Sequence, residues 1–351
     1  MTSPGILRPT DWLDDFELPP DLEANRPPEM RGLRRDEVRL MVVDGRETRH
    51  RRFHDVLDEL RPGDLLVVND SATIPAAVDV GESRVVHFST ELPGGLRVVE
   101  IRRNTVDGSK PDLEMTPGTI ELPGGANLEL LAPFPVDAPT RRLWVAHLDD
   151  GHGVDSLLRE HGRPITYTHS STDVPLAAYQ TVFATTPGSA EMPSAGRPFS
   201  HELVTALVSN GVGIVPLTLH TGVSSLEWGE PPYPERYWVP HYTAELVNVT
   251  RRRGARAIGV GTTVVRALET VVDVRGRAQA GSGWTDLVIG ADTPIRAVDG
   301  MITGWHEPLS THLDMLVALA GRQTIAESYE MALRLGYLWH EFGDSQLILA
   351  A

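Results

Sequence analysis

Apolar runs and amphipathic stretches alternate along most of this chain, and the alternation predicts strands followed by helices. Runs that are apolar at every position are typical of strands buried on both faces of a sheet. Strands are predicted at residues 38–43, 64–68, 212–219, 255–260 and 287–289, with a further strand-like segment at 301–306. Helices are predicted at residues 53–60, 201–209, 263–272, 311–319 and 324–335. The pattern is that of an α/β protein.

The segment from residue 74 to 148 has a different pattern. Its short alternating runs, at 85–88, 96–102, 119–122, 128–131 and 143–148, are separated by turns rich in Gly, Pro and Asp. Strands at this spacing predict a small antiparallel barrel or sandwich. Because strand–helix alternation resumes afterwards, we expect an α/β body made of residues 1–73 and 149–351, interrupted by a β-barrel domain at 74–148. Residues 1–35 are expected to form an arm with little regular structure.

Composition narrows the functional classes. The 351 residues contain no cysteine, which excludes disulfides, thiolate nucleophiles and zinc sites with sulfur ligands. No apolar run is long enough to cross a bilayer and the start lacks a signal-peptide pattern, so a cytoplasmic protein without a membrane partner is expected. The net charge of -16 repels polyanions, and nucleic-acid binding would need a local basic patch. The run Arg251-Arg252-Arg253 is more typical of a solvated helix end or loop than of a nucleic-acid contact, and it is the best candidate patch if tRNA binds. The sequence does not determine the oligomeric state, which is either a monomer or a dimer.

Four segments place polar residues just after a predicted strand, where open α/β sheets bind their ligands. They are Asn69-Asp70-Ser71, Thr218 to Gly222, Gly259 to Thr263 with Arg266, and Ile302 to His306. One such coincidence carries little weight, whereas four in one chain predict a binding site at this edge.

The turn Gly261-Thr262-Thr263 is the central candidate. Opening a helix, it offers backbone amides and two hydroxyl groups to a carboxylate or a ribose, and Arg266 stands one turn further on. The alternative is a tight strand–helix turn in which Thr262 caps the helix, and the shape of the segment does not choose between the two. The turn lacks the third glycine of a dinucleotide fingerprint and is no Walker loop, so NAD and ATP are not indicated.

His220 and His306 each follow a strand-like run and are candidate general bases, although a lone histidine is more often structural. Asp70 and Asp344 are either turn caps or acid–base groups. The spacing of His306, Glu307 and His312 does not match a metal-binding helix, and we expect no metal. The chain has no Gly-x-Ser-x-Gly elbow, which argues against an α/β-hydrolase.

These segments, in this order, resemble the S-adenosylmethionine:tRNA ribosyltransferase-isomerase family of queuosine biosynthesis. The resemblance runs from about residue 17 to 349. It is carried by collinear motifs: Pro62 to Asp70, Tyr179 to Ala184, Gly188-Ser189, Pro193 to Gly196, Thr218 to Gly222, Val260 to Glu269, Asp299 to His306 and Phe342 to Asp344.

The resemblance implies an α/β domain with an inserted β-barrel, and S-adenosylmethionine used as a ribosyl donor with loss of adenine and methionine. The acceptor in the family is a 7-deazaguanine in tRNA. Such chemistry needs a base, hydrogen-bond donors for the departing adenine and a clamp for the methionine carboxylate. As hypotheses, His220, His306, Asp70 and Thr262 are assigned as catalytic. Contacts to S-adenosylmethionine are assigned to Gly261, Thr262, Thr263, Arg266, Tyr179, Gln180 and Thr303.

The departures from the family pattern concern cationic and imidazole groups. The family motifs Asn-Asp-Thr-Arg and Ile-Pro-Ala-Arg end here in Ala72 and Ala77, and its Gly-Leu-His-Phe-Thr is Gly-Arg-Pro-Phe-Ser at 196–200. Its His-Met-His-x-Glu segment has no counterpart near residues 233–238. Its Asn-Phe-His-Leu-Pro is Gly-Trp-His-Glu-Pro at 304–308, and its Tyr-Arg-Phe-Phe-Ser-Tyr-Gly-Asp is Tyr-Leu-Trp-His-Glu-Phe-Gly-Asp at 337–344. The simplest interpretation is a retained donor site with a changed acceptor site.

Three functions follow as hypotheses. The first is ribosyl transfer and isomerisation, with either tRNA or a non-standard small molecule as acceptor. The second is lyase or cleavage chemistry on the same sulfonium donor. The third is a catalytically inactive relative that serves as a binding protein.

Overall fold

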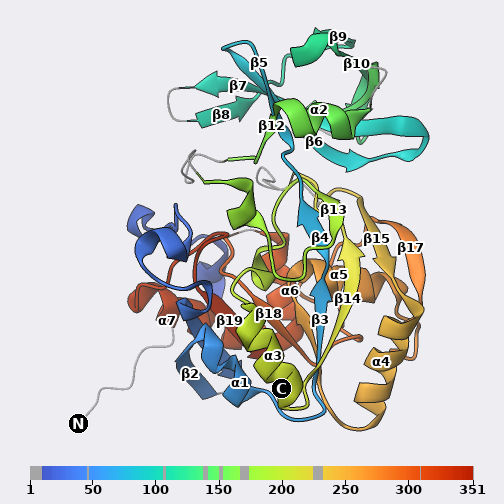
Figure 1. The fold of residues 1–351 in the computed structure, drawn as a ribbon. Helices are drawn as coiled ribbons and strands as arrows, with labels where there is room; N and C mark the ends of the chain where they lie inside the picture. The colour runs from blue at the N-terminus through green and yellow to red at the C-terminus, as the bar shows by residue number, and fades with distance from the viewer. Residues whose placement is uncertain are drawn as a thin grey trace.

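Four parallel strands form the centre of the larger sheet in the computed structural model of the protein (Figure 1). The structure describes residues 10–45, 47–105, 108–136, 141–149, 153–166, 174–223, 232–308 and 310–350. Within these ranges nine strands pair in the order β17-β15-β14-β3-β16-β18-β19-β1-β2. Their bounds are β17 Gly281–Thr285, β15 Glu235–Val239, β14 Gly213–Leu219, β3 Leu65–Asn69, β16 Ala257–Val260, β18 Gly300–Thr303, β19 Ser345–Leu349, β1 Arg39–Asp44 and β2 Glu47–Arg52. The central parallel strands are β14, β3, β16 and β18.

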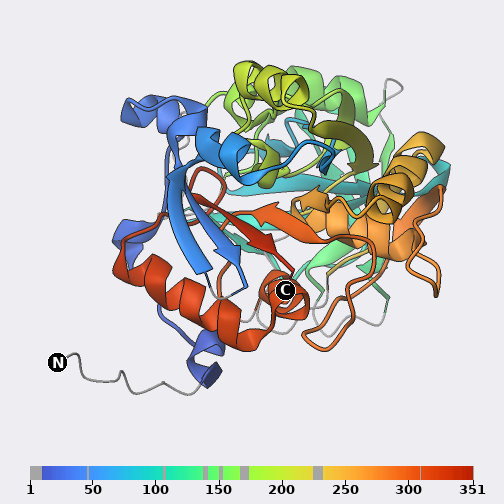
Figure 2. The same cartoon turned by 90° about the horizontal axis from the view of Figure 1, so that it is seen from below.

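Helices cover both faces of this sheet, because successive side chains of its buried strands point to opposite sides. Leu65 and Val67 of β3 pack in the cluster formed with helices α4 to α7, whereas Leu66 and Val68 pack in the cluster formed with α1 and α3. The helices are α1 Val56–Glu59, α3 His201–Ser209, α4 His241–Arg252, α5 Thr262–Val271, α6 Thr311–Ala320 and α7 Arg322–Arg334. The body is therefore a three-layer α/β/α domain, as Figure 2 shows in the view from below.

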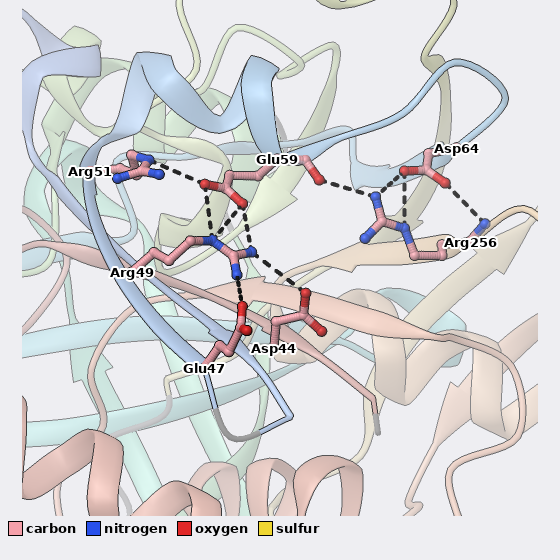
Figure 3. A network of polar contacts seen from close by, with 7 residues as sticks. All are labelled: Asp44, Glu47, Arg49, Arg51, Glu59, Asp64 and Arg256. Carbon is pink, nitrogen blue, oxygen red and sulfur yellow. Dashed lines mark hydrogen bonds and ion pairs between the residues drawn. The ribbon is translucent and has the colours of Figure 1, made fainter.

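The amino ends of the central strands are held by ion pairs (Figure 3). Asp64, just before β3, accepts hydrogen bonds from the backbone amides of Arg61 and Arg256 and pairs with the Arg256 guanidinium. Burial opposes the charge of Asp64, but these hydrogen bonds hold the pKa of its carboxyl below the ordinary value. This contact fixes β3 beside β16 at the edge opposite to the predicted site.

The second sheet is antiparallel and lies above the α/β body in Figure 1. Among the described residues its pairing path runs β12-β5-β6-β7-β11-β10-β9, with β8 beside β7. The strands are β5 Ala77–Val80, β6 Arg84–Glu91, β7 Leu96–Thr105, β8 Gly108–Pro111, β9 Gly118–Glu121, β10 Asn127–Phe134, β11 Leu143–Asp149 and β12 Gly162–Arg163. The path has two ends, so the sheet is confirmed while its closure into a barrel is not. Helix α2 Val154–His161 packs Leu157 and Leu158 into its core, and β12 extends the sheet beyond residue 148.

A short two-stranded ladder connects the two sheets. β4 Ser71–Thr73 continues from the end of β3 and pairs in parallel with β13 Thr186–Ser189. Figure 1 shows this ladder between the body and the antiparallel sheet. The polar segment after β3 therefore lies where the two parts of the molecule meet.

Most predicted elements of the α/β body are present within a residue or two. The strand predicted at residues 287–289 is wrong: the strand of this region is β17, and the carbonyl of Leu287 accepts a hydrogen bond from the side chain of Arg266 instead of pairing in a sheet. Strands β2, β15 and β19 of this sheet were not predicted. The described part of the N-terminal arm forms short 3₁₀ turns, the first at Thr10–Asp14, and buries Leu13 completely. No helix in the described ranges is long and apolar enough to cross a membrane.

Candidate active site

A cleft of about 980 Å³ lies between the two sheets, at the carboxyl edge of the parallel strands. Its volume is within the range of about 300–1,000 Å³ found for small-molecule sites. The α/β body contributes Thr218, His220 and Gly188 to its wall, and the antiparallel unit contributes Arg97 and Arg159. The cleft thus has walls from both parts of the chain.

His220 follows β14 directly and is the one member of the ten predicted site residues, all of them described, that lines this cleft. Its Nδ1 lies 2.8 Å from the hydroxyl oxygen of Ser71, which begins β4. Burial lowers the pKa of the His220 imidazole below its ordinary value, and the nearby Arg236 acts in the same direction. The ring is therefore neutral at neutral pH.

Asp70 lies directly behind the cleft wall. Its carboxylate accepts a 2.6 Å hydrogen bond from the hydroxyl of Thr218 and a longer one, 3.5 Å, from the hydroxyl of Thr186. Both threonines line the cleft. In this arrangement Asp70 orients two cleft hydroxyls, and its assignment as a catalytic residue stays a prediction.

The turn Gly261-Thr262-Thr263 opens helix α5 at the end of β16, the strand beside β3. Gly261 adopts a φ of 102°, which glycine tolerates best, and no side chain caps the helix. This removes the reading in which Thr262 serves as the cap. The hydroxyl of Thr263 lies 3.4 Å from the amide nitrogen of Asn69, whose side chain also bonds both backbone polar groups of Leu219. Asn69 thus ties the turn to the strand that carries His220.

Arg266 is buried and its guanidinium is fully engaged. It forms an ion pair of 2.6 Å with Glu235 of β15. It also donates to the backbone carbonyls of Tyr233, Thr285 and Leu287 at 2.9–3.0 Å. In this structure Arg266 holds β15, β17 and α5 together, and its predicted role as a carboxylate clamp stays a prediction.

His306 belongs to a separate buried cluster beyond β18. Its Nε2 lies 2.9 Å from the hydroxyl of Thr303, and its ring centre lies 4.9 Å from that of His312. Burial lowers the pKa of His306 well below the ordinary value, with His312 adding to the effect, and lowers the pKa of His312 to about 4. Both imidazoles are therefore neutral at neutral pH.

Tyr179 and Gln180 brace the ladder between the sheets. The side chain of Gln180 accepts from the amide of Thr73 and donates to its carbonyl, at 3.1 and 2.8 Å. Tyr179 is buried against Phe342, and burial, with Glu341 adding to it, raises the pKa of its phenol to about 12. Their predicted contact with S-adenosylmethionine stays a prediction.

Several cleft residues were missed by the sequence reasoning. Arg97 and Arg159 come from the antiparallel unit, and Arg236 and Trp238 come from β15. No motif marked them, because they meet only when the two sheets face each other. Ser71 and Ser189 belong to the motifs Asn69-Asp70-Ser71 and Gly188-Ser189 but were not assigned a role. The sequence feature that marks them is a hydroxyl side chain shortly after a predicted strand or directly after a glycine.

Arg251 of the basic run pairs with Asp299 at 3.2 Å near the end of α4. Since α4 leads into the amino end of β16, the run Arg251-Arg252-Arg253 lies at the edge of the sheet opposite to the cleft. The described residues also contain no group of three or more His, Asp or Glu side chains placed to hold a metal ion.

A parallel sheet with a two-walled cleft at its carboxyl edge is typical of α/β proteins that bind small molecules. The chain belongs to the family described as queuosine biosynthesis protein, whose model matches residues 13–348. It is accordingly an enzyme of the transferase-isomerase class.

Relatives named S-adenosylmethionine:tRNA ribosyltransferase-isomerase agree with this membership along nearly their whole length. The protein from Moorella thermoacetica is 35% identical and that from Syntrophotalea carbinolica 36% identical, each covering 95% of this chain and 98% of the relative. The crystal structure of S-adenosylmethionine tRNA ribosyltransferase from Thermotoga maritima superposes with a TM-score of 0.54 at 28% identity, over 96% of this chain and 100% of that one.

Proposed function

We propose that this enzyme transfers and isomerises the ribosyl group of S-adenosylmethionine onto a 7-deazaguanine base of tRNA. The observation that carries the proposal is the cleft at the carboxyl edge of β14 and β3, in a chain that matches such enzymes from end to end. The cleft is large enough for the donor together with one acceptor base.

The chemistry fits the groups around the cleft. The sulfonium of the donor acidifies the adjacent C5′ hydrogens, so that a base forms an ylide that expels adenine. The acceptor amine then attacks, and methionine leaves as a neutral thioether. Arg97, Arg159 and Arg236 supply cations suited to the methionine carboxylate or to an RNA phosphate, and the Gly261-Thr262-Thr263 turn offers helix-end amides at the neighbouring strand.

The mouth of the cleft supports a nucleobase as acceptor. Strands β15 and β17 pair with Arg236 opposite Trp284, and Trp238 opposite Ser282. The two tryptophans are 53% and 40% exposed, and the Arg236 guanidinium lies 6.0 Å from the Trp284 ring centre. Exposed aromatic rings beside an arginine are the platform on which unpaired bases stack.

The departures from the family motifs leave a non-standard small acceptor as the alternative. Ala77, at one of the two lost arginines, is fully buried in an apolar cluster with Val85 and Val98. An arginine cannot be accommodated there without rearranging that cluster. The change therefore lies in the packing between the two sheets, next to the cleft.

The decisive experiment incubates the purified protein with S-adenosylmethionine, with and without tRNA that carries the precursor base, and follows adenine and methionine. Release that requires the tRNA supports the proposal. Release without tRNA indicates a small acceptor or lyase chemistry. Tight donor binding without release would establish a binding protein instead.

A further inference from the structure

A chain of three hydrogen bonds leads from the protein interior to the cleft histidine. The amide of Thr221 donates to the hydroxyl oxygen of Ser189 at 3.0 Å. The hydroxyl oxygens of Ser189 and Ser71 are 2.6 Å apart, and Ser71 lies 2.8 Å from Nδ1 of His220. Ser71 and Ser189 are both completely buried, so water does not compete for these hydroxyl groups.

The direction of this chain follows from counting protons. Each hydroxyl has one proton to donate, and the amide of Thr221 already fixes the Ser189 oxygen as an acceptor. Within the described residues Ser71 is the one remaining group that can accept the Ser189 proton. Ser71 in turn has His220 Nδ1 left as the acceptor for its own proton. The opposite direction would leave a buried hydroxyl proton without an acceptor, at a cost of about 1–3 kcal/mol.

The glycine before Ser189 holds the ring against this chain. A Cβ atom at Gly188 would lie 2.5 Å from Nδ1 of His220 and 2.6 Å from its Cε1. The ring therefore packs directly on the Gly188 backbone, which leaves no space for a side chain between the two. Gly188 and His220 both line the cleft.

We propose that Ser71 and Ser189 are positioning residues that hold His220 as the neutral tautomer with its proton on Nε2, so that His220 is a hydrogen-bond donor to the substrate. With Nδ1 accepting from Ser71, the proton of a neutral imidazole resides on Nε2. Among the described residues Nε2 has no hydrogen-bond partner, and it is the ring nitrogen left for a ligand. The lone pair that a general base needs is absent from Nε2 in this tautomer, so another group removes the C5′ proton.

This assignment depends on the proposed function only for the identity of the substrate. A neutral Nε2–H group stabilises negative charge on the departing adenine without losing its proton. The tautomer itself is a property of the free enzyme and is measured without substrate, so the two proposals fail separately.

The test is long-range ¹H–¹⁵N correlation NMR of the full-length protein labelled with ¹⁵N-histidine at mildly alkaline pH. The signals of His220 are assigned by their loss in the His220→Gln variant. We expect a protonated Nε2 and an unprotonated Nδ1. A protonated Nδ1 in the wild-type protein overturns the proposal whatever the activity on S-adenosylmethionine.

Two substitutions at Ser71 test the positioning role. Ser71→Ala removes the donor to Nδ1, so both tautomers become populated and kcat falls by about tenfold, the worth of one hydrogen bond, with KM for S-adenosylmethionine little changed. Ser71→Thr keeps the hydroxyl and recovers both the Nε2–H signal and most of the lost turnover. Equal tautomer signals and equal kcat in the wild type and Ser71→Ala would refute the role.

Discussion

The guanidinium of Arg266 and the carboxylate of Glu235 form an ion pair of 2.6 Å in which the two side chains are 7% and 14% exposed. The second oxygen of Glu235 accepts from the amide of Gly222, two residues after His220. Burial raises the pKa of Glu235, and Arg266 opposes that rise. The pair therefore links helix α5 to the loop that carries the cleft histidine.

Replacing Arg266 with Ala leaves a buried carboxylate and three backbone carbonyls without their donor. We expect the free energy of unfolding to fall by about 3–5 kcal/mol, the usual cost of breaking a buried pair from one side. Urea denaturation measures this loss. The double variant Arg266→Met with Glu235→Gln should recover part of the stability, and Arg334→Ala, at an exposed position of α7, serves as the control within about 0.5 kcal/mol.

The same variant tests the clamp role predicted for Arg266. A clamp for the methionine carboxylate would raise KM for S-adenosylmethionine while leaving the unfolding curve unchanged. Unchanged stability with a raised KM in Arg266→Ala would therefore reverse the structural assignment.

The histidine pair behind β18 makes the fold sensitive to acid. Burial holds the pKa of His312 at about 4 and that of His306 well below 6.5. The unfolded chain takes up these protons near pH 6.5 and the folded chain does so only at lower pH, so stability is present above 6.5 and is lost as the pH falls toward the folded pKa. For His312 the loss is on the order of 2–3 kcal/mol between pH 6.5 and 4.

Unfolding curves measured from pH 7.5 to 4.5 for the wild type and His312→Asn check this. The carboxylates titrate in both proteins, so the gap in stability between them isolates the histidine. We expect the gap to shrink as the pH falls. A gap that is constant with pH would contradict the assignment.

Gly188→Ala tests the contact between the ladder and His220. Its Cβ would overlap the imidazole, and Gly188 has a φ of 155°, unfavourable for other residues. Displacing the ring by about 1 Å should lower kcat by roughly 100-fold, as measured by adenine release. Gly290→Ala meets only an ordinary contact at 3.9 Å and is the matched control. Full turnover in Gly188→Ala would exclude His220 from the reaction.

Sequence patterns located the α/β elements because a strand buried on both faces leaves an unbroken apolar run, as in β3 and β14. They missed β17, whose sequence Gly-Ser-Gly-Trp-Thr lacks such a run. They placed a strand instead on the apolar residues 287–289, although the Leu287 carbonyl is held by Arg266. Leu287 and Ile289 are apolar because they pack against the core. A local sequence pattern does not distinguish such packing from the pairing of a strand in a sheet.

The sequence predicted the position of the candidate site only as far as the edge of the sheet on which it lies. The ends of β3, β14, β16 and β18 do meet at one edge, because all four strands run parallel. The sequence pattern did not predict the cleft itself. Arg97 and Arg236 are 139 positions apart by their numbers and meet only through the stacking of the two sheets. Likewise the engagement of Arg266 by Glu235 depends on tertiary contacts that leave no spacing signal.

The stacking platform at the cleft mouth distinguishes a tRNA acceptor from a small one. Trp284 is held in place by a hydrogen bond from its indole nitrogen to the carbonyl of Glu91, and Arg236 pairs with the Glu91 carboxylate at 3.1 Å. These contacts fix the ring and the guanidinium before any ligand binds. A base that stacks there therefore loses little affinity to ordering the side chains.

Replacing Trp238 or Trp284 with Ala should weaken tRNA binding by about 1–3 kcal/mol each, or roughly 5- to 150-fold. Binding of S-adenosylmethionine should change little in Trp284→Ala, since Trp284 stands outside the residues that line the cleft. Fluorescence anisotropy with labelled tRNA that carries the precursor base and calorimetry with the donor measure the two affinities. Val208→Ala, at an exposed position on α3, is the surface control. If both tryptophan variants bind this tRNA as tightly as the wild type, the acceptor does not stack on this face, and a small-molecule acceptor becomes the better explanation.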